Sequence, residues 1–226
     1  MKTPILGARL ASAAGLVRQG AYLADIGTDH AFLPIFLLAE GKISRAVCSD
    51  INEGPLATAQ RNVSEAGFSD KVEFRLCNGA AKLSGLGITD YAICGMGGEL
   101  IADIINNARQ LFDSGVNLIL QPMTRRAHLV RFLAERGFQI LAEEYSVEAG
   151  RAYATLLVRF SGEVWQVSDF EAEFGKFDPR VAISRERNAY IEAKKRTLSV
   201  AAKGKILGGE QNPPELILLS EIEKIL

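Results

Sequence analysis

Short apolar runs alternate with helical patterns over the first 137 residues of the chain. Runs of four to six residues that are typical of buried strands lie at residues 21–25, 45–50, 72–77, 91–94 and 116–121. Apolar residues at helical spacing predict a helix at residues 4–18 and further helices that end near residues 38, 66, 112 and 136. Apolar strands separated by helices favour a parallel sheet buried on both faces. This part of the chain therefore predicts an α/β fold.

The pattern changes after Gly137. Strand-like runs at residues 139–147 and 153–160 are separated by only five residues. Such a connection is too short for a crossover helix, so we expect these two strands to pair as an antiparallel hairpin. The predicted sheet is thus mainly parallel, and it ends in a hairpin.

The last third of the chain predicts helices. The acidic residues 161–175 lose the strand pattern, and apolar stripes at helical spacing follow at 183–202 and 216–226. Gly208-Gly209 and Pro213-Pro214 separate the two stripes, a pattern that predicts an antiparallel helical hairpin. With a boundary near Gly162, the two domains are expected at residues 1–161 and 162–226.

Composition limits the architecture and the compartment. A chain of 226 residues, 48% of them hydrophobic, buries one full core and leaves roughly 60 residues for an appendage. The cysteines Cys48, Cys77 and Cys94 lack metal-ligand or redox spacing and end strand-like runs, which is typical of reduced thiols in a cytoplasmic protein. No run of about 18 apolar residues is present, so we expect neither a membrane span nor export, and no metal site.

Basic residues are concentrated in the predicted appendage. Residues 180–205 hold eight Lys or Arg and two Asp or Glu, a net charge of +6, whereas the whole chain has a net charge of −1. The rest of the chain therefore has a net charge of about −7. A basic arm on an acidic protein indicates a surface that binds a polyanion, although a solvated helix face is an equally good interpretation.

A carboxylate and a glycine turn end the first apolar run, at Asp25-Ile26-Gly27-Thr28-Asp29-His30. Such a turn leaves backbone N–H groups free at the start of the next helix, where a polar cofactor binds. A diphosphate-binding loop needs small residues after its first glycine, and here Thr28, Asp29 and His30 follow instead. A carboxylate at this point suits S-adenosylmethionine, a sulfonium cation without phosphate. We expect a methyltransferase in which Gly27 shapes the turn and Asp25 binds the loop amides or the methionine ammonium.

Further cofactor-binding residues are expected where the next strands end. Asp50 ends the second run, in a position to bind both ribose hydroxyls of an adenosine, or else it caps the following helix. Asn78-Gly79 either forms a turn or presents an amide to the adenine edge. Gly95 allows the backbone to approach a flat base, and Met96 lies against an adenine face unless it is an ordinary core residue.

Three motifs and the helical appendage together resemble the bacterial TrmK family. The motifs are Asp-Ile-Gly-Thr-Asp-His at 25–30, Cys-Gly-Met-Gly-Gly-Glu at 94–99 and Leu-Ile-Leu-Gln-Pro at 118–122. Members of this family are tRNA adenine-N1 methyltransferases that act on adenine 22. The resemblance implies a class I methyltransferase, with a Rossmann-like sheet that ends in a hairpin and a coiled-coil-like appendage. It also implies S-adenosylmethionine as cofactor and tRNA as partner, and it leaves open whether the protein is a monomer or a homodimer.

The implied reaction assigns three catalytic candidates. Adenine N1 has a lone pair, so methyl transfer needs alignment more than a strong base. Asp29 is expected to hold the adenine N6 amino group and stabilise the cationic product, unless it caps the following helix. His30 is expected to contact the base or a phosphate, unless it is a structural residue. Gln121, at the end of the fifth run, is expected to bond to the target base.

Contacts to the RNA are expected on both domains. Arg9 either contacts RNA or closes over the cofactor carboxylate, and Gly97 lets the backbone approach a base. The residues expected to bind the substrate are Arg9, Gly97 and Arg125 on the core and Lys194, Lys195 and Arg196 in the appendage. Two other functions stay open: a methyltransferase for a small molecule or protein with a dimerising tail, and a non-catalytic RNA-binding scaffold.

Overall fold

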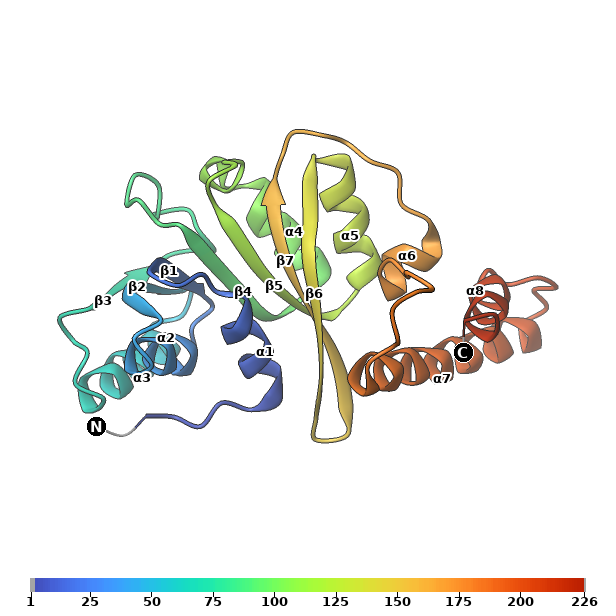
Figure 1. Cartoon of the computed structure of the whole chain (residues 1–226), viewed down its shortest axis with the longest axis horizontal. Helices are drawn as coiled ribbons and strands as arrows, with labels where there is room; N and C mark the ends of the chain where they lie inside the picture. Colours follow the sequence, from blue (N-terminus) through green and yellow to red (C-terminus); the bar gives the residue numbers. More distant parts are fainter. Residues whose placement is uncertain (1–2, 226) are drawn as a thin grey trace.

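A seven-stranded sheet, in the order β3-β2-β1-β4-β5-β7-β6, forms the centre of the molecule (Figure 1). The computed structural model describes residues 3–225. The strands are β1 (Ala21–Ile26), β2 (Ile43–Asp50), β3 (Val72–Leu76), β4 (Asp90–Gly97), β5 (Asn117–Thr124), β6 (Phe138–Glu148) and β7 (Arg151–Phe160). The predicted α/β fold with a mainly parallel sheet is confirmed.

The first five strands are parallel, and the strand order reverses between β1 and β4. Asp25 near the end of β1 pairs with Cys48 of β2 on one side and with Ala92 of β4 on the other. Because chain connections leave β1 and β4 in opposite directions, a crevice opens at the carboxyl ends of these two strands. The loop after β1 and the junction of β4 with the next helix, which hold the two glycine motifs, meet at this edge of the sheet, which we call the carboxyl edge.

The predicted hairpin is present, and its second strand lies inside the sheet. β7 pairs antiparallel with β5 on one side and with β6 on the other, so β6 is the edge strand. The turn between the two strands holds Ala149 and Gly150, both at positive φ. β6 runs parallel to β5, and Glu148 at its end therefore lies at the carboxyl edge.

Helices cover both faces of the sheet and bury two apolar cores. α1 (Ala8–Leu16), α2 (Phe32–Ala39) and α3 (Glu53–Glu65) pack on one face, and α4 (Gly98–Asn106) and α5 (Arg126–Glu135) pack on the other (Figure 1). A 3-10 turn, η1 (Arg109–Leu111), follows α4. The residues that set the helical spacing of the sequence are buried, such as Ala13 and Ala14 of α1, although α1 is shorter than the predicted 4–18 and α4 ends at Asn106, before the predicted end near residue 112.

The C-terminal helices form an arm that projects from the hairpin (Figure 1). The long helix α7 (Arg185–Leu207) contacts β6 and β7 at its start, and α8 (Glu215–Glu223) folds back on it. Tyr190, Ile191 and Ile222 are buried there with Phe174 and Ala154 in a third apolar cluster. The predicted helical hairpin is confirmed over the residues that the structure describes. Leu226, the last residue of the predicted stripe, lies outside them.

The segment between hairpin and arm is more ordered than its acidic sequence indicates. A short helix, α6 (Asp169–Phe174), begins with a capping box in which Ser168 and Glu171 bond to each other's backbone N–H groups. Trp165 Nε1 donates to Phe138 O at 2.8 Å, so the chain follows the core after residue 162. The division of the chain at that residue stays a prediction.

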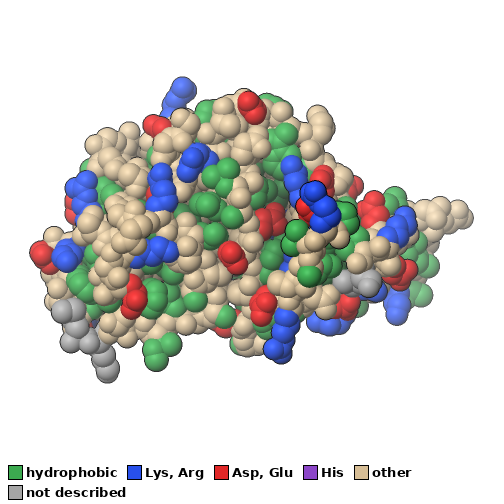
Figure 2. Space-filling model, in the orientation of Figure 1, with side chains coloured by type: hydrophobic (Ala, Val, Ile, Leu, Met, Phe, Trp, Pro, Cys, Tyr) green, Lys and Arg blue, Asp and Glu red, His purple; other side chains and the backbone are tan. Residues whose placement is uncertain are grey.

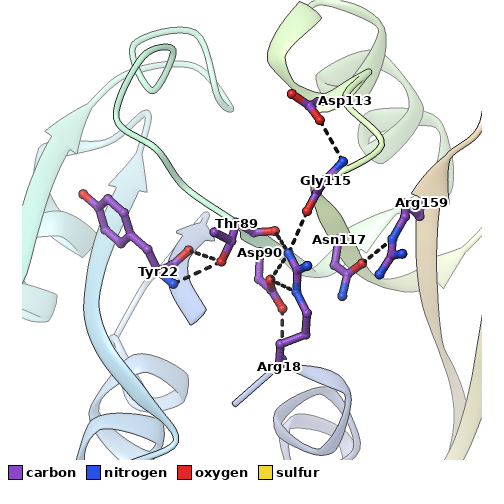
Figure 3. A network of polar contacts seen from close by, with 8 residues as sticks. All are labelled: Arg18, Tyr22, Thr89, Asp90, Asp113, Gly115, Asn117 and Arg159. Atoms are coloured by element: carbon purple, nitrogen blue, oxygen red, sulfur yellow. Dashed lines mark hydrogen bonds and ion pairs between the residues drawn. The ribbon is translucent and has the colours of Figure 1, made fainter. Parts of the chain in front are cut away.

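An ion pair between Arg18 and the buried Asp90 fixes the opposite edge of the sheet (Figure 3). Asp90 begins β4 and is fully buried, and it accepts hydrogen bonds from Arg18 Nε at 2.7 Å and from the Arg18 backbone N–H at 3.0 Å. Arg18 also donates to the carbonyls of Thr89 and Gly115. The chain between α1 and β1 is thus held to the start of β4, far from the carboxyl edge.

None of the helices in residues 3–225 is long and apolar enough to span a membrane.

Candidate active site

A cavity of about 390 Å³, which we call the site cavity, opens at the carboxyl edge between β1, β4 and α1. It brings together six residues that the sequence predicts as functional: Arg9, Asp25, Gly27, Asp29, His30 and Gly95. Phe32, Leu33 and Cys94 complete its walls together with Leu10 and Thr28. Burial raises the pKa of the Cys94 thiol to about 12. The thiol is therefore neutral near pH 7 and is not a nucleophile there.

The Asp25–Gly27 loop is fixed by hydrogen bonds to the next strand. The backbone N–H groups of Gly27 and Thr28 both donate to Ser49 O, at 2.8 and 3.1 Å. Gly27 has a φ of 71°, and a Cβ atom there would lie 2.2 Å from the Met96 methyl group. Only glycine satisfies both conditions. Met96 therefore lies over the loop, which brings together two residues that the sequence places in the cofactor site.

Asp25 is a buried carboxylate without a cationic partner in the described residues. Its side chain is 7% exposed, Thr28 Oγ1 donates to its Oδ2 at 2.6 Å, and no Lys, Arg or His nitrogen of residues 3–225 lies within 4 Å of it. Burial, with a smaller contribution from the Asp50 charge, raises the pKa of Asp25 to about 6, although the Thr28 hydrogen bond lowers it. A bound cation would supply the charge that this carboxylate lacks.

Asp50 and the Asn78-Gly79 turn lie beside this loop. Asp50 Oδ1 accepts the Asn52 backbone N–H at 2.8 Å, and Asn52, not Asp50, is the N-cap of α3. Among residues 3–225, no hydrogen bond donor contacts Asp50 Oδ2. Ser49 Oγ donates to Gly79 O at 3.2 Å, which ties the turn after β3 to β2. Asp50 can therefore present a carboxylate oxygen to a hydroxyl group.

A second cavity, of about 490 Å³, opens between the turn after β3 and α4. Its walls are formed by Asn78, Gly79, Ala80, Ala81, Leu100, Asp103, Ile104, Asn107 and Ala108. Ile104 lies close to Gly79, which has a φ of 54°. The mixture of apolar side chains with the Asn78 amide suits a flat, polar-edged ring such as adenine.

Asp29 and His30 stand at the mouth of the site cavity on a strained loop. Asp29 has a φ of 40° and Ala31 has a φ of 55°, two left-handed conformations within three residues. The Asp29 side chain is 67% exposed, and its Oδ2 lies 3.3 Å from His30 Nε2. Asp29 does not cap α2. The N-cap residue of that helix is Ala31, and no side chain bonds to the free backbone N–H groups of its first turn. The exposed carboxylate is thus free to meet a substrate.

Gln121 lies behind the cavity wall instead of on it. The side chain is fully buried, and its Oε1 accepts hydrogen bonds from Arg9 Nη1 at 2.8 Å and from the Gly95 backbone N–H at 3.0 Å. The predicted direct bond from Gln121 to a target base has no counterpart in this geometry, because the carbonyl oxygen is already used twice. Gln121 instead joins α1 to the end of β4, and so it positions Arg9 and Gly95.

Sequence patterns did not indicate Glu148, which also holds α1 in place. Glu148 Oε2 accepts the Arg9 backbone N–H at 2.9 Å, and its carboxylate lies against Gly7 at the start of α1. The two partners are 139 residues apart in the sequence. The only signal for this contact in the sequence is a glutamate at the end of a predicted hairpin strand. The negative charge at the N-terminus of a helix is favourable.

Gly97 and Arg125 lie at the edge of the site without lining the site cavity. Gly97 pairs with Thr124 of β5, so its backbone belongs to the sheet. Arg125 is exposed, and its Nε lies 3.7 Å from Glu99 Oε1. A Cβ atom on Gly98 would lie 2.4 Å from Arg125 O, so the starts of α4 and α5 pack closely together.

Ion pairs reduce the charge of the arm that is available to a ligand. Lys194 Nζ binds Glu173 Oε2 at 3.0 Å, Arg180 binds Asp178, and Lys205 binds Glu215. On the face seen in Figure 2, acidic and basic side chains of the arm lie side by side. Within residues 3–225, Lys195 and Arg196 have no acidic partner within 4 Å. Of the three predicted basic contacts, these two are the ones that the fold leaves accessible.

Comparisons with known proteins assign the family. Residues 6–156 match the family described as methyltransferase domain, and the chain therefore belongs to that family. The chain is 32% identical over 152 residues to tRNA (adenine(22)-N(1))-methyltransferase of Bacillus subtilis (strain 168), a match that covers 67% of this chain and 64% of that protein. Within the described range, no cluster of three or more His, Cys, Asp or Glu could hold a metal ion.

Solved structures narrow the assignment. A Streptococcus pneumoniae protein proposed to be a tRNA (m1A22) methyltransferase, in complex with S-adenosyl-L-methionine, is 32% identical with a TM-score of 0.85 over 98% of this chain and all of that chain (100%). TrmK of M. capricolum, in complex with S-adenosyl-homocysteine, is 27% identical with a TM-score of 0.74, over 98% of this chain and 94% of that chain. The chain is a member of the TrmK-like family.

Proposed function

We propose that this protein transfers a methyl group from S-adenosylmethionine to N1 of an adenine in tRNA, adenine 22 by analogy with its relatives. The observation that carries the proposal is the pair of carboxylates in one cavity. Asp25 is buried and lacks a cationic partner in the described chain, whereas Asp29 is exposed at the mouth. The first suits a cationic cofactor, and the second suits the amino edge of a base.

The residues on the inner side of the site fit the cofactor. Asp25 lies where a cationic ammonium group would compensate its charge, and the glycine at position 27 keeps the loop free of a side chain. Asp50 has a carboxylate oxygen for the ribose hydroxyls. The cavity beside Asn78 and Gly79 would receive the adenine. When bound, S-adenosylmethionine supplies a methyl group on a positively charged sulfur, which the lone pair of adenine N1 attacks directly.

The residues at the mouth would orient the target. Asp29 would accept a hydrogen bond from the N6 amino group of the adenine, and its negative charge would stabilise the positive charge that methylation leaves on the base. Arg9 and Gly95 would be held in place against the base by the buried Gln121 carbonyl oxygen. No group has to remove a proton before transfer, so catalysis depends on alignment.

The arm would bind the body of the tRNA. Lys195 and Arg196 are accessible, and a polyanion with regularly spaced phosphates is the ligand that such a surface attracts. A folded tRNA is recognised largely by shape and by phosphate contacts. A tRNA substrate supports a cytoplasmic location for the enzyme.

The decisive experiment is transfer of a labelled methyl group to unmodified bulk tRNA, followed by nucleoside digestion and mass spectrometry. We expect 1-methyladenosine as the labelled product. Asp29→Ala is expected to reduce turnover strongly while cofactor affinity stays within about tenfold of the wild type. Asp70→Ala, an exposed carboxylate at the opposite edge of the sheet, serves as the control. Label in protein or small molecules, with none in tRNA, would refute the proposal.

A further inference from the structure

Two exposed aromatic rings stand together at the rim of the site cavity. His30 and Phe32 are stacked, with ring centroids 5.1 Å apart and an angle of 17° between the ring planes. Phe32 is 40% exposed at the first residue of α2, although the next apolar residues of that helix, Leu33 and Ile35, are buried. A large apolar ring that is exposed to solvent beside a functional site is characteristic of a surface that binds a ligand.

The backbone holds this ring pair outward. The left-handed conformations of Asp29 and Ala31 alternate with His30 and Phe32, and Asn62 Nδ2 donates to His30 O at 3.0 Å. Aspartate tolerates a positive φ, but alanine gains nothing from it. The strained backbone of this loop therefore keeps both rings exposed. Backbone strain of this kind is concentrated at functional sites.

Phe32 lies on the ridge between two cavities. It lines the site cavity, and it also lines a neighbouring cavity of about 360 Å³. That neighbouring cavity is formed by Thr3, Pro4, Ile5, Phe32, Ile35, Asn62, Glu65 and Ala66. Ile5 in its wall is 98% exposed. We call the exposed apolar surface of Pro4, Ile5 and Phe32, with His30 stacked on Phe32, the base shelf.

We propose that the base shelf stacks an unpaired nucleobase that flanks the target adenine in the RNA. This inference rests on the proposed function. N1 lies on the Watson–Crick edge of adenine, so the target has to be unpaired before methylation, and its neighbour loses a stacking partner as the target enters the site cavity. Aromatic and apolar side chains restore that stacking. Among the described residues, the only charged one that lines the neighbouring cavity is Glu65, which disfavours a phosphate and favours the neutral base.

The test compares Phe32→Ala, Phe32→Leu and Phe32→Trp, with Val164→Ala as a matched exposed apolar control on the core. The substrate is unmodified tRNA, and a second tRNA carries 2-aminopurine at the nucleotide beside the target. We expect Phe32→Ala and Phe32→Leu to lower kcat/KM for tRNA by about 10- to 100-fold, the effect of losing one stacked base. Phe32→Trp is expected to stay within about threefold of the wild type.

Two further measurements separate stacking from a structural effect. The affinity for S-adenosylmethionine is expected to be unchanged in all Phe32 variants, and the thermal midpoint is expected to fall only slightly, because the residue is 40% exposed. The fluorescence of the flanking 2-aminopurine is expected to fall on binding to the wild type and to Phe32→Trp, but not to Phe32→Ala. Equal kcat/KM in wild type, Phe32→Ala and Phe32→Leu would overturn the inference, as would an equal loss of cofactor affinity.

The wild-type reaction distinguishes this inference from the proposed function. If the wild type does not methylate tRNA, the proposed function fails whatever the variants do. If the wild type methylates tRNA and the flanking base is not quenched, the base shelf is refuted and the proposed function stands.

Discussion

Asp25 destabilises the folded protein when it is charged, and in the proposed function the same charge favours cofactor binding. The carboxylate is buried without a cation in the described chain, and its pKa is raised from 3.8 to about 6. Such a rise corresponds to about 3 kcal/mol by which the charged form destabilises the folded state. The sequence predicts the residue and its role from the position at the end of a strand, but the cost follows from burial, which depends on the packing of α1, β1 and β4.

Asp25→Asn is expected to stabilise the protein without cofactor at neutral pH and to weaken cofactor binding. The folded protein holds the Asp25 proton more tightly than the unfolded chain, so the carboxylate destabilises the fold increasingly as the pH rises from about 4 to 6. The stability gain from asparagine should therefore approach about 3 kcal/mol at pH 8 and vanish near pH 4. Urea denaturation at both pH values measures the stability gain, and calorimetry measures the affinity for S-adenosylmethionine. An equal gain at both pH values would contradict the explanation.

Asp50→Ala is expected to reduce the affinity for S-adenosylmethionine by about 2–4 kcal/mol while the fold persists, because charge-assisted hydrogen bonds to the ribose are lost. Asp50 also accepts the Asn52 N–H, so a small loss of stability should accompany the change. Titration calorimetry gives the affinity, and Asp70→Ala is the control. Unchanged affinity would place the ribose elsewhere.

At the scale of elements, contacts between distant residues decide what the sequence could not predict. The sequence predicts the strands and the hairpin correctly, because each strand is a run of apolar residues that becomes buried in the fold. The local capping box of Ser168 and Glu171 is a sequence signal for the start of α6 that the apolar pattern did not use, whereas the last turn is held by arginines from other helices, which the sequence does not show. The exposed ring of Phe32 likewise follows from backbone conformation, which no apolar pattern records.

Arginines from two helices bind the carbonyl groups at the end of α6. Arg126 of α5 is 2% exposed, donates to the carbonyls of Glu171 and Ala172, and binds Glu143 Oε1 at 2.7 Å. Arg187 of α7 donates to Phe174 O at 3.0 Å and to Lys176 O at 2.8 Å. The base of the arm is thus fixed to a helix that starts at the carboxyl edge, and the arm has a set direction relative to the site.

Arg126→Met is expected to destabilise the protein by about 3–5 kcal/mol, because it leaves the Glu143 carboxylate and two carbonyls without their donor. Arg131→Met, which breaks an exposed ion pair to Asp169, is expected to cost at most about 1 kcal/mol. Urea denaturation compares the two variants. Hydrogen exchange should show the loss of protection first in α6 and the start of α7, and uniform loss would argue against a local clamp.

For the whole molecule, the proposed function divides binding between the arm, which would bind tRNA, and the core, which would bind the cofactor. The sequence overstated the charge of the arm, because three of its basic residues pair with acidic residues that lie on or near it. The Lys194 and Lys205 pairs depend on how the chain folds back, so counting charges along the sequence could not find them, whereas Arg180 pairs locally with Asp178. Within α7, which the structure describes throughout, the basic side chains without an acidic partner or a carbonyl contact are Arg185, Lys195, Arg196 and Lys203.

The double variant Lys195→Glu, Arg196→Glu is expected to weaken tRNA binding and leave S-adenosylmethionine affinity unchanged. The slope of log affinity against log salt should become shallower by roughly 0.7–0.9 for each phosphate that the arm no longer binds. Filter binding over a range of salt concentrations measures the slope. Arg45→Glu, Lys71→Glu, at the opposite edge of the sheet, carries the same change in charge and serves as the control. An unchanged slope in the arm variant would assign RNA binding to the core.

The place of β7 between β5 and β6 has a consequence for biosynthesis. Arg9 is synthesised 139 residues before Glu148, whose carboxylate holds the Arg9 backbone N–H. β5 stays an open edge until β7 is inserted beside it. We therefore expect the nascent chain to acquire its cofactor site only after the hairpin has emerged, so that a ribosome stalled before residue 148 carries a chain that cannot bind S-adenosylmethionine.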